Sequence, residues 1–294
     1  MNSILVSAPA KINLYLDVTS KRPDGYHNIL SIMQSVSLCD EVFIERSTDV
    51  GIQLICEDES IPLGNENIAY RAAELFLKTA MLTAGVKISL RKSIPMAAGL
   101  AGGSADAAAV LRGLNRMFSN PFSADGLCKM ASSLGADVPF CVRGGCMKAE
   151  GIGDVLSELP TLSDCNIVVS CPNKRESTPA AYAALDRMYN NFENYGGNDL
   201  LYYRAEAALC EKNIAGVCRN LYNVFESINQ HREDIAELKR MMLEAGADGA
   251  MMSGSGPSVF GIFKDAQAAQ MAVMRLGQHG YIAYNCTPVQ KFAF

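Results

Sequence analysis

Apolar and polar residues alternate along the first part of the chain. Residues 3 to 18 contain two apolar runs interrupted at Ala8-Pro9-Ala10, and the second run, Ile12 to Val18, alternates between apolar and polar positions. A period of two residues is typical of a strand with one buried face. The pattern therefore predicts two short strands here, with further strands over Ser35 to Arg46, Gly51 to Cys56 and Val86 to Leu90.

Other segments carry the spacing and end signals of helices. In the first half of the chain the predicted helices cover Glu66 to Ala84, Asp106 to Met117 and Ser123 to Leu134. Asn65 or Asn67 would cap the first of them and Ser123 the third. In the second half we predict strands over Cys165 to Cys171 and Tyr281 to Tyr284, a helix that starts at Thr178-Pro179, and helices over Asp199 to Lys212, Ile214 to Leu221, Arg232 to Ala245 and Ala266 to Gly277.

This mixture of helices and strands predicts an α+β fold. The 294 residues are many for one simple core and suit two lobes that share an interface. The composition changes between Pro160 and Ser163, so we expect an N-terminal lobe of residues 1–160 and a C-terminal lobe of residues 161–294.

Composition and charge narrow the function classes. Hydrophobic residues make up 49% of the chain and charged residues 19%, and the net charge of −5 comes with no Lys/Arg block, which disfavours nucleic-acid binding. No apolar run reaches the roughly 18 residues of a membrane span. The ten cysteines form no Cys-x-x-Cys pair, which suits a reducing compartment. We therefore expect a cytoplasmic protein, either a monomer or a homodimer.

A glycine-rich stretch between a predicted strand and a predicted helix is the first candidate site. This glycine loop (Pro95 to Ala105) holds Gly99, Gly102 and Gly103 and no bulky polar side chain. Exposed backbone N–H groups and a helix N-terminus together form an anion site, most often for phosphate. The spacing matches neither a Walker A loop nor a dinucleotide fingerprint. A plain helix cap by Ser104 or Asp106 is the alternative.

Two charged residues stand in otherwise apolar surroundings. Lys11 opens the alternating run after Pro9, where it could also be an edge-strand charge. Asp137 lies in the apolar segment Gly135 to Cys141, which we expect to connect a helix end to a strand. A carboxylate in such a segment must cap, pair with a cation or take part in catalysis.

Two further segments are candidate ligand contacts. Lys21 to His27 is a turn with a Pro-Asp-Gly core, and its Tyr26 and His27 could stack on and hydrogen-bond a ring, unless the turn is simply solvated. Ser253 to Ser258 is a run of small residues between two predicted strands. Its composition suits close approach to another backbone segment or to a phosphate.

Four motifs in one order together resemble the GHMP kinase superfamily. They are Pro9 to Leu14, the glycine loop, Gly135 to Pro139 and Met252 to Ser258, and the match runs nearly end to end. The resemblance implies an N-terminal lobe similar to the second domain of ribosomal protein S5 and a ferredoxin-like C-terminal lobe. It also implies that ATP, with Mg²⁺, and a small-molecule acceptor meet in the cleft between them.

The resemblance also implies roles for individual residues. Lys11 and Asp137 match the catalytic pair, and the segment Lys21 to His27 resembles a branch that phosphorylates the 2-hydroxyl of a cytidine-diphosphate-bearing erythritol in isoprenoid precursor biosynthesis. Tyr26 and His27 would then read the cytidine, Tyr182 would be a second aromatic at the base, and Asn13 would contact the acceptor. The ATP contacts would be Pro95, Met96, Ala97, Ala98, Gly99, Leu100, Ala101, Gly102, Gly103, Ser104 and Ala105.

Two residues depart from the family pattern, which usually has Gly at position 101 and Ser at position 105. Ala101 adds a methyl group where the backbone could need a positive φ, and Ala105 lacks a hydroxyl. Neither touches the expected base, so we expect an active kinase with altered nucleotide affinity. Ser104 is a candidate Mg²⁺ ligand, although no carboxylate is an obvious one.

Two other functions stay open. A kinase of the same superfamily could act on homoserine, mevalonate or a sugar, but such substrates present no pyrimidine to the Arg22 to His27 turn. A nucleotide-binding protein without catalysis is the second possibility, and the presence of both Lys11 and Asp137 argues against it.

Overall fold

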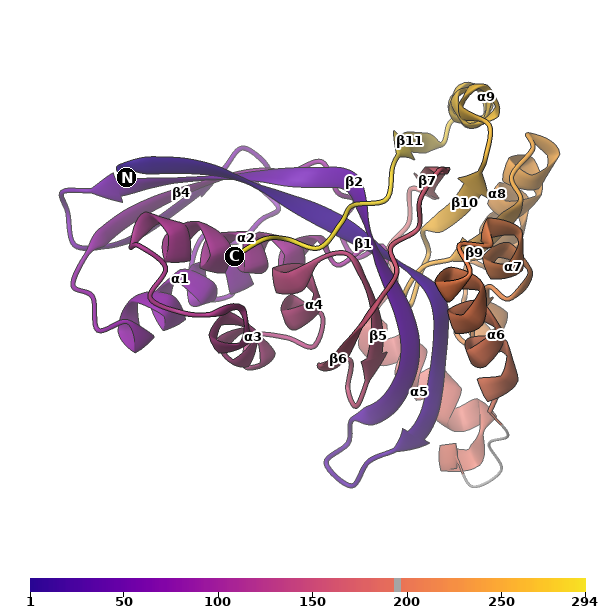
Figure 1. Ribbon diagram of the computed structural model, residues 1–294, viewed down its shortest axis with the longest axis horizontal. Coiled ribbons are helices and arrows are strands. Elements are labelled where there is room, and N and C mark those ends of the chain that lie inside the picture. The colour runs from indigo at the N-terminus through magenta and orange to yellow at the C-terminus, as the bar shows by residue number, and fades with distance from the viewer. Residues whose placement is uncertain (193–196) are drawn as a thin grey trace.

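The computed structural model describes residues 1–192 and 197–294, and these residues form two sheets with helices packed against them (Figure 1). The larger sheet of the described residues has seven strands: β1 (Ser3–Lys21), β2 (His27–Ser47), β3 (Gly51–Cys56), β4 (Gly85–Arg91), β5 (Cys146–Glu150), β6 (Val155–Leu159) and β8 (Tyr222–Asn223). The smaller has four, in the order β11 (Ile282–Cys286), β7 (Asn166–Cys171), β10 (Val259–Phe263) and β9 (Gly249–Met252).

The helices divide between the two sheets. Those packed with the larger sheet are α1 (Ile68–Thr79), α2 (Gly102–Met117), α3 (Ala124–Ser132) and α4 (Val138–Arg143). Beside the smaller sheet and the adjoining part of β1 lie α5 (Thr178–Met188), α6 (Asp199–Cys210), α7 (Ile214–Arg219), α8 (Arg232–Glu244) and α9 (Ala266–Gln278), with short 3₁₀ turns at Asn190–Phe192 and Glu226–Ile228. Among the described residues, every helix is too short or too polar to cross a bilayer.

The first strand is one element and not the predicted pair. β1 pairs with β2 from Ser3 to Lys21, and the predicted break at Pro9 is a register shift between Pro9 and Lys11. Such a bulge bends a strand without ending it, and it accommodates a proline that cannot donate to the ladder. The continuous hairpin carries the turn around Tyr26 far from the sheet centre, next to α5 (Figure 1).

Helix α2 begins at Gly102, four residues before its predicted start. Ala101 precedes it with a left-handed backbone, at φ 58°, and the helix has no side-chain cap. The alternative in which Ser104 or Asp106 caps the helix is therefore excluded, because both residues lie within its first turns. The caps predicted at Asn67 and Ser123 are confirmed, since each side chain accepts from a backbone N–H of its helix.

The segment after Asp137, predicted only to connect a helix end to a strand, contains a short helix. α4 spans Val138–Arg143, and Pro139 occupies its first turn. A proline is accepted there because that N–H has no partner within the helix. α1 ends at Thr79, five residues before its predicted end at Ala84, and Met81 then turns with a positive φ of 52°.

Candidate active site

A cleft of about 910 Å³ lies where the two groups of elements meet. Its walls come from β1, the β1–β2 turn, the segment before α1, the glycine loop, Asp137 and α5. Of the site residues predicted from the sequence, all line the cleft except two. Leu100 and Ala105 belong to the glycine loop but are buried in the core.

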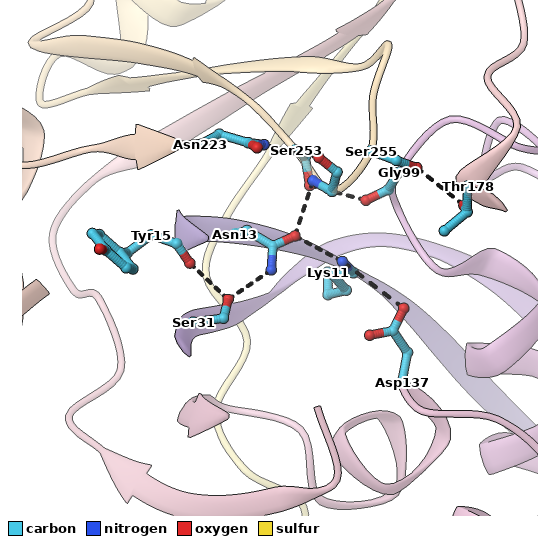
Figure 2. Close-up of polar contacts among 11 residues, drawn as sticks. Lys11, Asn13, Tyr15, Ser31, Gly99, Asp137, Thr178, Asn223, Ser253 and Ser255 are labelled. Carbon is cyan, nitrogen blue, oxygen red and sulfur yellow. Dashed lines mark hydrogen bonds and ion pairs between the residues drawn. The ribbon is translucent and has the colours of Figure 1, made fainter. Parts of the chain in front are cut away.

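The glycine loop is held in place through its carbonyl groups. Ala97 O accepts from Glu176 N at 3.2 Å, and Ala98 O accepts from Ser258 N at 3.2 Å. Gly99 O accepts from Ser253 Oγ at 3.0 Å, as Figure 2 shows, and Leu100 O accepts from Lys11 N at 3.1 Å. Four successive carbonyl groups are thus fixed by donors outside the loop, and the Ser253–Ser258 segment provides two of these donors.

The N–H groups of the loop differ from its carbonyl groups in their hydrogen bonding. In the part of the chain that the structure describes, no N–H group from Met96 to Ala101 donates to a protein acceptor. The first N–H groups of α2 have no partner within the helix either, and the helix dipole adds partial positive charge there. The loop therefore presents unpaired donors at a helix N-terminus, the arrangement that anion sites use.

Two small residues make this loop shape possible. Gly99 has φ 78°, and a Cβ added to it would lie 2.1 Å from the carbonyl oxygen of Ser253. Only glycine fits this approach between the two backbone segments. Ala101, which replaces the expected glycine, does adopt the positive φ anticipated from the sequence.

Lys11 and Asp137 face each other across the cleft from β1 and the start of α4 (Figure 2). Their Nζ and Oδ2 atoms are 3.9 Å apart, and the Lys11 side chain is 6% exposed while that of Asp137 is 34% exposed. Asp137 precedes α4 without capping it by its side chain. The pairing therefore leaves the carboxylate accessible from the cleft beside an ammonium group that is almost fully buried.

Asn13 orients this ammonium group. Its Oδ1 accepts from Lys11 Nζ at 2.7 Å and from Gly254 N at 3.0 Å, and its Nδ2 donates to Ser31 Oγ at 2.9 Å. These bonds engage both polar atoms of a side chain that is almost fully buried. Asn13 thereby links the strand that carries Lys11 to the Ser253–Ser258 segment (Figure 2).

The predicted aromatic residues gather at the end of the cleft near the β1–β2 turn. Tyr26 is 61% exposed, whereas His27 is buried and its ring lies 4.8 Å from that of Tyr182. Asp186, which the sequence analysis missed, bonds His27 Nε2 at 2.7 Å and Lys21 Nζ at 2.7 Å. These contacts fix the His27 ring. The Tyr26 ring is exposed and can contact a ligand in the cleft.

A buried charge cluster under the glycine loop was also missed. The Lys92 ammonium group bonds both Asp40 and Asp106, and one oxygen of Asp106, Oδ1, has no partner among the described residues. Burial raises the pKa of Asp106 to about 7, and the Asp40 carboxylate adds to this rise while Lys92 opposes it. Because the three residues lie far apart in the sequence, only the fold could indicate that they meet.

Comparison with known proteins agrees with this geometry. Residues 67–145 match the model of the GHMP kinases N-terminal domain, and residues 205–282 match that of the GHMP kinases C-terminal domain. A 4-diphosphocytidyl-2-C-methyl-D-erythritol kinase from Acetivibrio thermocellus is 44% identical over 92% of this chain and 94% of its own. The chain belongs to the 4-diphosphocytidyl-2-C-methyl-D-erythritol kinases, a family of the GHMP kinases. It is therefore an ATP-dependent phosphotransferase.

Other relatives extend the comparison. The same kinase from Caldicellulosiruptor saccharolyticus is 42% identical over 93% of this chain and 92% of its own. A crystal structure of a 4-(cytidine 5'-diphospho)-2C-methyl-D-erythritol kinase superposes with a TM-score of 0.81 at 34% identity, covering 97% of this chain and 99% of that one. A homoserine kinase from Cytophaga hutchinsonii, with a TM-score of 0.77 and 21% identity over 99% of this chain and 96% of its own, shares the fold.

We predict that the glycine loop of this GHMP kinase does not accept a side chain at Gly99. Gly99→Ala would force Ser253 away and strain the backbone, so the free energy of unfolding should fall by about 2 kcal/mol or more. Gly103→Ala is the control, because Gly103 is helical and its Cβ would lie 3.7 Å from Ile68, so the change should leave the free energy of unfolding unchanged or raise it by up to about 1 kcal/mol. Urea unfolding of both variants measures this, and equal losses would contradict the prediction.

A second prediction concerns Asp106. Its raised pKa means that the folded protein keeps a proton that the unfolded chain, with a pKa of 3.8, has already released. The free energy of unfolding should therefore fall as pH rises between about 4 and 7, by up to about 1 kcal/mol per unit. This contribution should vanish in Asp106→Asn. Urea unfolding at several pH values compares the two slopes, and parallel slopes would refute the prediction.

Proposed function

We propose that this kinase transfers the γ-phosphoryl group of ATP to the 2-hydroxyl of 4-diphosphocytidyl-2-C-methyl-D-erythritol, with Asp137 as the base and Lys11 as its partner. The observation that carries the proposal is the Lys11–Asp137 pair, 3.9 Å apart, in the same cleft as a loop with unpaired N–H donors. In this proposal the acceptor hydroxyl and the ATP phosphates meet in that part of the cleft.

The reaction needs a proton acceptor and charge stabilisation. A tertiary alcohol is a weak nucleophile, so Asp137 takes the hydroxyl proton as the alcohol oxygen bonds to the γ-phosphorus and the bond to ADP breaks. Lys11, beside this carboxylate, stabilises negative charge on the transferring phosphoryl group. Asn13 keeps the ammonium group in place through its 2.7 Å hydrogen bond.

The two ends of the cleft suit the two nucleotides. The glycine loop takes the ATP phosphates, and the apolar side chains of Ile61, Pro62 and Ile68 beyond it suit the adenine ring. At the other end, Tyr26 and the His27–Tyr182 pair take the cytosine by stacking and hydrogen bonding.

Mg²⁺ accompanies ATP in this proposal. Among residues 1–192 and 197–294, no group of three or more His, Cys, Asp or Glu side chains could hold a metal ion. That suits an ion bound mainly by phosphates and water, as Mg²⁺ commonly is with nucleotides, and the Ser104 hydroxyl in the cleft is the side chain that would hold it. The ion would neutralise charge on the phosphates.

The choice of acceptor tests the proposal directly. We expect ADP release from ATP and Mg²⁺ with 4-diphosphocytidyl-2-C-methyl-D-erythritol, and none above background with 2-C-methyl-D-erythritol 4-phosphate, homoserine or mevalonate. Turnover with one of these three in place of the cytidylated compound would assign the protein to another GHMP kinase activity. Binding of ATP without stimulation by any acceptor would indicate a non-catalytic nucleotide-binding protein.

Replacing the proposed base gives a sharper test. Asp137→Asn keeps the size of the side chain, so the protein should fold and bind ATP while kcat falls by about 10²-fold to 10⁴-fold. Asp248→Asn is the control, because Asp248 is a carboxylate of similar exposure, 31%, that lies 4.0 Å from the Lys264 ammonium group and does not line the cleft. Steady-state kinetics and calorimetric ATP titration measure both effects. An Asp137→Asn protein with nearly full kcat would exclude this residue as the base.

A further inference from the structure

Arg112 is a buried cation with no carboxylate partner among the described residues. It lies in the middle of α2 and is 4% exposed. Its Nη1 donates to the carbonyl oxygen of Cys141 at 2.6 Å, and its Nη2 donates to that of Ser7 at 2.6 Å. Burial lowers the pKa of Arg112 to about 10. Burying a charged group costs free energy, so the presence of a guanidinium group at this buried position needs an explanation.

The two acceptors belong to the two elements that carry the proposed catalytic pair. Ser7 lies on β1, four residues before Lys11, and Cys141 lies in α4, four residues after Asp137. The Cys141 N–H also donates to the Asp137 carbonyl oxygen at 3.1 Å, so one turn of helix joins the arginine contact to the carboxylate residue. A planar guanidinium group with two divergent donors fixes the spacing of two such carbonyl groups.

The C-terminal segment (residues 287–294) covers this arginine. After β11 the chain returns to the larger sheet and ends near α2 (Figure 1). The Phe292 ring lies 3.9 Å from the guanidinium carbon of Arg112, and Phe292 N donates to Arg143 O, at the end of α4, at 2.8 Å. The same ring packs on Gly144, where an added Cβ would lie 2.8 Å from it. The last residues of the chain thus enclose the junction between β1, α2 and α4.

We propose that Arg112 is a positioning residue for phosphoryl transfer, which sets the separation of Lys11 and Asp137 by tying β1 to α4 under the cover of Phe292. The inference rests on the proposed roles of Lys11 and Asp137. Arg112 acts through the backbone and touches neither substrate, because it does not line the cleft. A shift of about 1 Å in a catalytic group can cost 10²-fold in rate, so a small change at this junction has a large effect.

Arg112→Lys tests the proposal, because lysine keeps the charge but cannot hold both carbonyl groups in a planar fork. We expect kcat to fall by about 10-fold to 100-fold, while KM for ATP and for the cytidylated acceptor change by less than about twofold. In an Asp137→Asn background the same change should alter residual kcat by less than about twofold, since there is no base left to misplace. A purely structural role would reduce kcat equally in both backgrounds.

Two more variants keep the test decisive. Arg46→Lys is the matched control. Arg46 also donates to a carbonyl group, Met117 O at 3.2 Å, and lies over an aromatic ring, that of Phe118. It does not contact the elements at Lys11 and Asp137 through these groups, so the kcat of this variant should be unchanged. Phe292→Leu serves if Arg112→Lys does not fold, and should lower kcat by about three- to tenfold with KM unchanged. Equal kcat losses in both backgrounds, or a raised KM with unchanged kcat, would overturn the inference. Absence of wild-type turnover would instead refute the proposed function.

Discussion

The candidate active site depends on the way in which the carbonyl groups of the glycine loop are held. Four consecutive carbonyl groups, from Ala97 to Leu100, accept hydrogen bonds from outside the loop. A peptide unit whose oxygen is fixed on one side directs its N–H group to the other, so these bonds orient the donors of the anion site. The loop itself needs no charged side chain, and its small residues allow the close approach.

The donors of these bonds come from both parts of the molecule. Ser253, Ser258 and Glu176 belong to the C-terminal half, whereas Lys11 lies on β1. The candidate anion site is therefore shaped by residues from both parts of the molecule. The packing of these two parts also brings Gly254 to Asn13, which holds the Lys11 ammonium group. The proposed phosphate site and the orientation of the proposed catalytic pair thus share one structural cause.

Local sequence patterns predicted most helices and strands correctly. They failed where contacts between residues far apart in the chain determine the bounds of an element. The Asn67 and Ser123 caps follow from nearby residues, and both are confirmed. The continuity of β1 across Pro9 depends on pairing with β2, and the start of α2 depends on the left-handed backbone of Ala101. Asp137 was identified as a candidate because a carboxylate in an apolar segment is costly, although the short helix that follows it was not predicted.

The sequence by itself determined the alternation of helices and strands, the glycine loop and the motifs that resemble the GHMP kinases, because these depend on residues close together in the chain. The tertiary structure alone decided which side chains meet. Asp186 at His27, Asp40 and Asp106 at Lys92, and Arg112 between β1 and α4 join residues far apart in the sequence. No local pattern encodes such contacts, since they arise from the packing of whole elements against one another.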